Sequence, residues 1–167
     1  MDSPALLAMT DFRQQIPVTI EPDMSIEWAL QRMKTAGVRL LFVVNPGKPL
    51  LGLITSTDIQ GEKPVQFRQQ LNLRHEEIMV RDIMTPHGEL EATDMADVER
   101  ATVGDIVSLL EKVGRRHALV LDQDPHTGAP AIRGIFSASR IEKQLDRIIE
   151  TINIAQTFAE VESVLNN

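Results

Sequence analysis

At 167 residues, the chain is long enough for one domain of ordinary size or for two small subdomains that share a core. It contains no cysteine, which excludes disulfides and thiolate chemistry and fits a reducing, cytoplasmic compartment. A formal net charge of −7 argues against nucleic-acid binding, and the apolar run Leu40–Val44 is far shorter than the roughly 20 residues of a membrane-spanning helix.

The first predicted elements are a strand and a helix. Residues 16–22, IPVTIEP, alternate between apolar and polar as strands do. Apolar side chains then recur at helical spacing and predict one buried stripe, formed by Ile26, Ala29, Leu30 and Met33. Ser25 can cap the start of this helix, and Gly37 can end it in the left-handed conformation.

A hairpin and a second helix come next. The run Leu40–Val44 is rich in β-forming residues, and the turn formers NPGKP follow it. The phrase GLITSTDI at 52–59 predicts the second strand of the hairpin and the start of a helix. Gly61 and Pro64 interrupt that helix soon after it begins.

The same order of elements returns in the second half. An offset of 77 residues places Gly114 opposite Gly37 and Thr102 opposite Ser25. The apolar stripe of the second predicted helix consists of Val103, Ile106, Val107 and Leu110. Residues Ala118–Leu121 and the phrase GIFSASRI at 134–141 repeat the hairpin, after a turn that is five residues longer.

Several segments lie outside the matched elements. RDIMTPH at 81–87 predicts a short helix ended by Pro86. The strand predicted at Leu90–Thr93 is weak, and the acidic run Asp94–Glu99 after it is predicted to be a solvated loop or helix face. The C-terminal predictions are a helix over 139–150, a strand at 151–156 and a helix over 157–165.

Each half is predicted to be a β-α-β-β-α unit, which is too small to bury both faces of its sheet. We therefore predict an α+β (α/β) fold in which two such units pack sheet to sheet. The predicted domains are a first repeat with the N-terminal segment at 1–79, a second repeat at 80–150 and a C-terminal extension at 151–167.

This pattern resembles the CBS domain pair, named after cystathionine β-synthase. The resemblance covers about residues 15–148 and rests on IMT at 83–85, GVRLLFVVN at 37–45, GRRHALVLD at 114–122 and above all GLITSTDI. It implies a stand-alone regulatory module that binds an adenosine-containing small molecule in a cleft between the repeats. The implied ligands are AMP, ADP, ATP or S-adenosylmethionine, and the implied partners are a second copy in a homodimer and a regulated protein of unknown identity.

The resemblance also implies a role for individual residues. Thr55 and Asp58 would contact the ribose, because a carboxylate can accept hydrogen bonds from both hydroxyls of a cis-diol; alternatively, they only cap the following helix. The backbone of Val18, Thr19 and Ile20 would contact the base. The predicted phosphate contacts are Arg39, Arg115, Arg116 and His117. These cations could instead pair with acids or lie at a dimer interface.

The second repeat departs from the pattern at one position. Ser137 keeps the hydroxyl of Thr55, but Arg140 replaces Asp58 and cannot accept a hydrogen bond. Arg140 therefore either pairs with a surface acid or faces a phosphate. We expect one competent adenosine cleft, at Thr55 and Asp58, and a doubtful second one.

Three functions remain open. The leading hypothesis is a ligand-sensing regulatory module, and the alternative is a ligand-free scaffold for dimerisation. For the single Trp28, a buried or interface position is favoured over stacking on a base. An enzyme is the poorest hypothesis, because no nucleophile stands with its base and no glycine-rich phosphate loop is present. We predict neither a cofactor nor a metal site, since His117 has no further ligands at metal-binding spacing.

Overall fold

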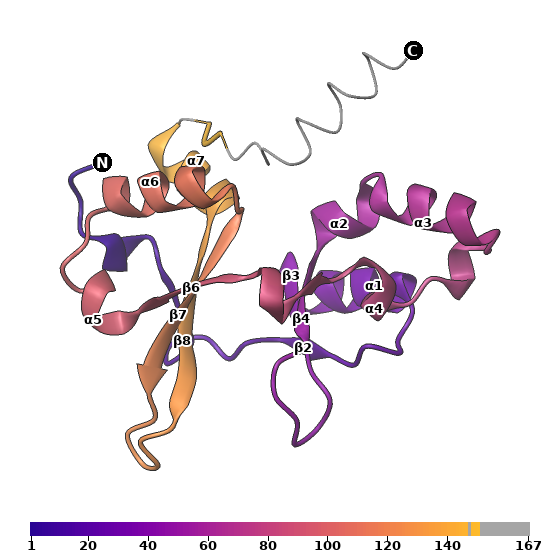
Figure 1. Cartoon of the computed structure of the whole chain (residues 1–167), viewed down its shortest axis with the longest axis horizontal. Coiled ribbons are helices and arrows are strands. Elements are labelled where there is room, and N and C mark those ends of the chain that lie inside the picture. Colours follow the sequence, from indigo (N-terminus) through magenta and orange to yellow (C-terminus); the bar gives the residue numbers. More distant parts are fainter. Residues whose placement is uncertain (147, 151–167) are drawn as a thin grey trace. The chain divides into compact units, whose positions relative to one another are not determined.

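A computed structural model describes residues 1–146 and 148–150, which form two compact units. One unit is Ile16–Leu90, and the other combines Met1–Gln15 with the residues from Glu91 onward. Each has a four-stranded sheet and its own helices (Figure 1). We call them the first-repeat unit and the second-repeat unit. The packing of the two sheets against each other stays a prediction, and the predicted elements at 151–165 lie outside the described residues.

The first-repeat unit contains a sheet of strand order β2-β3-β4-β5, in which β2 runs parallel to β3 and the other pairs are antiparallel. Its strands are β2 (Thr19–Ile20), β3 (Leu40–Val43), β4 (Gly52–Thr55) and β5 (Thr85–Pro86). Its helices are α1 (Ile26–Ala36), α2 (Ser56–Gln60), α3 (Lys63–Leu71) and α4 (Val80–Ile83), with short 3-10 helices at His75–Glu77 and His87–Glu89.

The second-repeat unit has the strand order β1-β8-β7-β6, with β6 parallel to β7. Its strands are β1 (Thr10–Asp11), β6 (Glu91–Asp94), β7 (His117–Gln123) and β8 (Pro130–Ser137). Its helices are α5 (Met95–Val98), α6 (Val103–Val113) and α7 (Ala138–Leu145), with a 3-10 helix at Ala5–Leu7. In Figure 1 the indigo N-terminal segment lies beside the orange strands of this unit.

The two long helices form where the apolar stripes predicted them. The hydroxyl of Ser25 accepts a hydrogen bond from the backbone N–H of Trp28 at the start of α1. Thr102 and Asp105 form a capping box at the start of α6. Gly37 and Gly114 end the two helices at φ of 69° and 66°, a region that a Cβ disfavours. The predicted helix boundaries are therefore confirmed.

Some shorter elements differ from the sequence prediction. The strand predicted over 16–22 is reduced to β2, because Pro17 and Pro22 flank it and cannot donate to a ladder. Helix α4 ends at Ile83, and Pro86 lies in strand β5 instead of ending the helix, since a residue that precedes proline favours extended backbone. Helix α7 ends at Leu145, not at residue 150.

The segments predicted as a weak strand and as an acidic loop or helix face both form regular secondary structure. The weak strand predicted at 90–93 is β6, paired with β7 in parallel. The acidic run forms the short helix α5, whose Met95 and Val98 are buried while Asp94, Asp97 and Glu99 are exposed. The acidic side chains thus lie on a solvated helix face.

The segments that precede the two repeats are themselves a repeat, related by an offset of 75 residues. Thr10 pairs with Ile135 of β8, just as Thr85 pairs with Leu53 of β4. The carbonyl of Ser3 accepts the N–H of Val103, and the carbonyl of Ile78, 75 residues on, accepts the N–H of Ile26. Each leading segment therefore caps a helix and extends a sheet in the same way.

This pairing explains the glycine that begins each repeated phrase. A Cβ on Gly52 would collide with the backbone carbonyl of Thr85, and one on Gly134 would collide with the carbonyl of Thr10. Glycine is therefore required for the close approach of the leading strand.

The N-terminal segment consequently belongs to the second-repeat unit, and not to the first repeat with which its place in the sequence grouped it. Ala5, Ala8 and Met9 are buried in the core that also contains Leu110 and Phe136. A separate core in the first-repeat unit includes Ile26, Met33, Leu41 and Ile54. Within the described residues, no helix is both long and apolar enough to cross a bilayer.

Candidate functional site

The residues predicted to contact a ribose lie at the junction of β4 and α2. Thr55 is the N-cap of α2, and its hydroxyl accepts a hydrogen bond from the N–H of Asp58 at 3.1 Å. Asp58 Oδ2 accepts the N–H of Thr55 at 3.0 Å. The predicted capping role of both residues is therefore present, and the box fixes the carboxylate at the start of the helix.

The second oxygen of Asp58 faces a cation. Lys63, in the first turn of α3, donates to Asp58 Oδ1 at 3.0 Å. The Asp58 side chain is 16% exposed, whereas that of Lys63 is 51% exposed. An exposed lysine holds its partner weakly, because solvent screens the pair and the long side chain loses rotamer entropy. Asp58 Oδ1 is thus the oxygen that can exchange its donor.

The backbone of Arg39 is hydrogen-bonded to the helix that carries this carboxylate. The N–H of Ser56, the first residue of α2, donates to the carbonyl of Arg39 at 2.9 Å. Arg39 is exposed, and its guanidinium has no hydrogen-bond or ion-pair partner among the described residues. Of the cations predicted to contact phosphate, Arg39 is the one that belongs to the first-repeat unit, where its carbonyl binds the first residue of the helix that contains Asp58.

The residues predicted to contact a base form the edge of the same sheet. The carbonyl of Val18 accepts the N–H of Phe42 in β3, and the carbonyl of Ile20 accepts the N–H of Val44, directly after β3, both at 3.0 Å. Thr19 lies between them, so its carbonyl points away from β3. Arg32 of α1 donates its Nε to this carbonyl at 2.7 Å. Sequence reasoning missed Arg32, which carried no motif; only its position one turn above Trp28 on the predicted helix could have drawn attention to it.

The corresponding junction in the second-repeat unit is built differently. Ser137 is the N-cap of α7, but its side chain makes no capping hydrogen bond. Arg140 is exposed and donates to the hydroxyl of Thr10 in β1. This partner is a neutral hydroxyl, not the surface acid or the phosphate that the sequence predicted for Arg140.

The three basic residues at the start of β7, Arg115, Arg116 and His117, lie in different environments. The carbonyl of Arg116 accepts the N–H of Ala138, as Arg39 does for Ser56. The Arg116 guanidinium donates to Glu142 at 2.9 Å and to the carbonyl of Ile149 at 3.0 Å. Arg115 is half-buried, and His117 begins β7. Arg116 therefore connects α7 to the buried Ile149.

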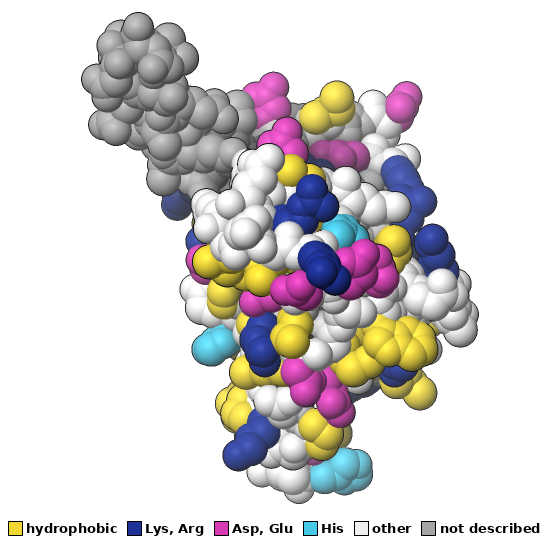
Figure 2. Space-filling model, turned by 90° about the vertical axis from the view of Figure 1, so that its right-hand side faces the viewer, with side chains coloured by type: hydrophobic (Ala, Val, Ile, Leu, Met, Phe, Trp, Pro, Cys, Tyr) yellow, Lys and Arg dark blue, Asp and Glu magenta, His cyan; other side chains and the backbone are white. Residues whose placement is uncertain are grey.

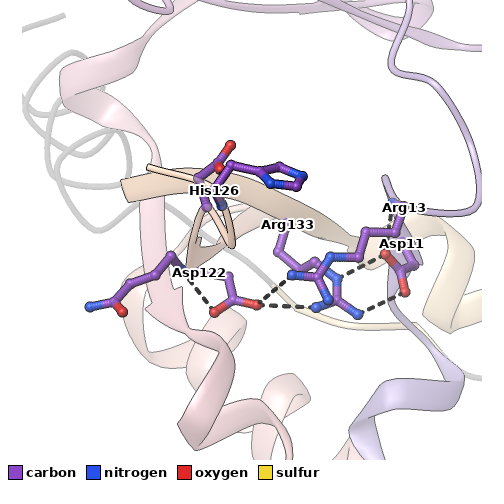
Figure 3. A network of polar contacts seen from close by, with 7 residues as sticks. Asp11, Arg13, Asp122, His126 and Arg133 are labelled. Atoms are coloured by element: carbon purple, nitrogen blue, oxygen red, sulfur yellow. Dashed lines mark hydrogen bonds and ion pairs between the residues drawn. The ribbon is translucent and has the colours of Figure 1, made fainter. Parts of the chain in front are cut away.

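A further ion-pair network holds the N-terminal strand to the second-repeat unit (Figure 3). Arg133 of β8 binds Asp11 through two hydrogen bonds, at 3.0 and 3.3 Å, and also binds Asp122 at 3.1 Å. Arg13 lies 3.6 Å from Asp122. The side chains of Arg133 and Asp11 are only 16% and 18% exposed. The fork of the guanidinium thus connects β1, β7 and β8.

These contacts shift two pKa values. The hydrogen bonds from the Arg133 guanidinium and, next, from the backbone N–H of Arg13 hold the pKa of Asp11 below its ordinary value. The hydrogen bond to Asp11 raises the pKa of Arg133. Comparison of the two repeats could have pointed to this network. Arg133 and Asp122 are charged, whereas the first repeat has Leu51 and Asn45 at the corresponding positions.

The surface charge gives no large region of one sign on the face shown in Figure 2, where Lys and Arg lie among Asp and Glu with hydrophobic side chains between them. On this face, any attraction for phosphate must therefore be local. Among residues 1–146 and 148–150, no three His, Asp or Glu side chains are grouped to hold a metal ion.

Comparisons with known proteins agree with this fold. Residues 9–62 match the model of the CBS domain. No curated protein matches the sequence. An uncharacterised conserved protein from Pyrococcus horikoshii has a similar structure, with a TM-score of 0.59 and 23% identity, over 91% of this chain and 98% of its own.

Two further solved structures carry informative descriptions. A putative signal-transduction protein with CBS domains from Burkholderia ambifaria matches with a TM-score of 0.58 and 19% identity, over 85% of this chain and 91% of its own. CBSX2, from Arabidopsis thaliana and in complex with AMP, matches with a TM-score of 0.54 and 22% identity, over 87% and 99%. Residues 9–62 are therefore similar to a CBS domain, and over most of its length the chain has the fold of solved CBS-domain proteins.

Proposed function

We propose that the first-repeat unit binds a ribonucleotide and that occupancy of this site regulates a partner protein. The observation that carries the proposal is the Asp58 carboxylate. Its Oδ2 is fixed by the backbone of Thr55, while its Oδ1 is held only by an exposed lysine. A fixed, mostly buried carboxylate with one exchangeable oxygen suits the two hydroxyls of a ribose.

The surroundings of Asp58 favour a nucleotide over a free sugar. The carbonyl of Arg39 is hydrogen-bonded to Ser56, the first residue of α2. The guanidinium of Arg39 is unpaired among the described residues, and its planar fork suits a phosphate. Strand β2 offers backbone at the edge of the same sheet. Ribose, phosphate and base would thus each meet a group of the first-repeat unit.

The likeness to CBSX2 in complex with AMP supports an adenosine-containing ligand. AMP, ADP, ATP and S-adenosylmethionine are therefore the first compounds to test. The second repeat lacks the acid at Arg140, so one such nucleotide per chain is expected. Regulation requires that the ligand bind two arrangements of the protein with different affinity.

Isothermal titration calorimetry with the whole chain tests the site. Asp58→Asn should weaken binding about tenfold or more, since it removes charged acceptors of hydrogen bonds. Asp105→Asn is the matched control, because Asp105 has the same capping-box role at α6 without a predicted ligand. Both substitutions should weaken a helix cap, but only the first should weaken nucleotide binding.

Two results would contradict this function. One is the absence of binding by any of the nucleotides at millimolar concentration. The other is equal loss of affinity in Asp58→Asn and Asp105→Asn, which would assign the loss to helix stability. Two equivalent nucleotides per chain would leave the Asp58 site standing but would show that Arg140 does not prevent binding in the second repeat.

A scaffold for dimerisation is the second candidate, favoured by apolar side chains on the helices of the first-repeat unit. Trp28 of α1 is 58% exposed, and Val65 and Leu71 of α3 are 52% and 56% exposed. Exposed large apolar residues are typical of association surfaces when they gather in a patch. Light scattering should then report a dimer with or without nucleotide, and Trp28→Ser should produce monomers.

A further inference from the structure

The geometry points to Arg32 as the residue that selects the base of the bound nucleotide: it favours a purine with an oxo group at position 6 over one with an amino group. This inference rests on the proposed nucleotide site and names the chemistry of its base. Under it, AMP remains a ligand, and the 6-oxo ribonucleotide of equal charge, IMP, binds more tightly.

One edge of the first-repeat sheet is formed by β2. The carbonyls of Val18 and Ile20 accept the N–H groups of Phe42 and Val44 on the neighbouring segment. The carbonyl of Thr19 is therefore the outward-facing acceptor of this strand. An exposed backbone acceptor here would attract the amino group of an adenine, which is a hydrogen-bond donor.

Arg32 replaces that acceptor with donors. Its Nε donates to the Thr19 carbonyl at 2.7 Å, which fixes the guanidinium at the strand edge. The side chain is exposed, and its Nη1 and Nη2 groups have no partner among the described residues. None of the residues three or four positions away on α1 is acidic, so no neighbour on the helix neutralises the charge.

The consequence is a preference at position 6 of a purine. An oxo group accepts hydrogen bonds from guanidinium N–H groups, and those to a charged donor are about twice as strong as neutral ones. An amino group is a donor and cannot accept a hydrogen bond from the cation. The Thr19 carbonyl, which could have accepted its N–H, is already bound by Arg32. A base with a donor at this position must first displace Arg32.

The experiment compares AMP with IMP, because the two carry the same ribose and phosphate. Their dissociation constants are measured by calorimetry for the unchanged protein, Arg32→Ala and Lys34→Ala. Lys34 is an exposed residue of the same helix, and its removal changes the net charge equally. Circular dichroism melting of each variant shows whether it is folded.

The unchanged protein should bind IMP about tenfold more tightly than AMP, the size expected of one hydrogen bond to a charged group. Arg32→Ala should abolish or invert this ratio, and Lys34→Ala should keep it. A ratio that favours AMP in the unchanged protein, or one that Arg32→Ala does not move, overturns the selection by Arg32 while leaving the nucleotide site intact. Failure of both nucleotides to bind overturns the proposed function and this inference together.

Discussion

The starts of α2 and α7 occupy equivalent places in the two repeats, yet their first turns are stabilised in different ways. At α2, Thr55 and Asp58 close a capping box within one turn of chain. At α7, Ser137 makes no such bond, and Arg140 reaches Thr10 instead. One junction is self-contained, and the other depends on a strand 130 residues away in sequence.

The difference shows what reversal of one charge can do to a repeated phrase. An acid at the third position of a helix accepts backbone N–H groups and favours the positive end of the helix dipole. A cation there cannot do either. In this chain it contacts the N-terminal segment, which Arg133 also holds through Asp11. The second repeat has thus exchanged a local cap for tertiary attachment of the leading strand.

The largest expected effect tests the feature that both repeats share. Gly52→Ala and Gly134→Ala should each cost about 3 kcal/mol of unfolding free energy, because the new Cβ would force the leading strand away from the sheet. Gly88→Ala is the control, since a Cβ there would meet nothing within 4 Å. Chemical denaturation measures the three values. If Gly52→Ala and Gly134→Ala lost no more unfolding free energy than Gly88→Ala within error, β1 and β5 would not be closely held.

The next test breaks the attachment that only the second repeat has. Arg133→Met should lower the free energy of unfolding by about 2 kcal/mol. It removes charge-assisted hydrogen bonds and leaves the Asp11 carboxylate mostly buried without its cation. The equivalent first-repeat position is the apolar Leu51, so Leu51→Met should cost much less. Limited proteolysis should cut residues 1–15 faster in Arg133→Met. Equal cutting rates would contradict the role of Arg133 in holding β1.

The same attachment should depend on pH. The pKa of Asp11 is lower in the folded protein than in the unfolded chain, so the ionised carboxylate stabilises the fold. This stability is complete above the ordinary carboxyl pKa and is lost as pH falls through the lowered one. Between neutral pH and pH about 3, the free energy of unfolding should therefore fall more in the unchanged protein than in Arg133→Met. Parallel pH profiles would refute this linkage.

A smaller effect measures the two caps directly. Thr55→Ala should cost about 1 kcal/mol, as loss of an N-cap usually does. Ser137→Ala should change the free energy of unfolding very little, because that side chain caps nothing. Equal costs at the two positions would mean that the junctions are alike in solution.

The smallest net effect is expected when the reversed charge is restored. Arg140→Asp loses the hydrogen bond to Thr10 but supplies an acid to the first turn of α7, and the two changes should nearly cancel. The informative measurement is Ser137→Ala in this background, which should now cost about 1 kcal/mol. A cost that stays near zero would show that α7 cannot form the box.

Much of the fold could be predicted from the sequence because its signals are local. Apolar spacing, a hydroxyl before each stripe and a glycine after it were enough to place α1 and α6. The repeated phrases predicted both hairpins and both helix starts. The lengths of β2 and α7 were less predictable, because they depend on strand partners and on where burial stops.

The sites were less accessible to sequence reasoning. Thr55 and Asp58 lie three residues apart, so their mutual contact follows from a single turn of chain. Arg32 and Thr19, or Arg133 and Asp11, meet only after strands have paired. The repeat of MT at 9–10 and 84–85 was the available signal that residues 1–15 extend a sheet.

The sequence by itself determined that this chain is two β-α-β-β-α repeats, and that the acid of one repeated phrase is a cation in the other. Tertiary structure alone decided which unit takes up the N-terminal segment and which partner each arginine finds. Periodicity and capping act within a few residues and are visible in order along the chain. Sheet edges and ion pairs join residues more than a hundred positions apart, and their geometry exists only after folding.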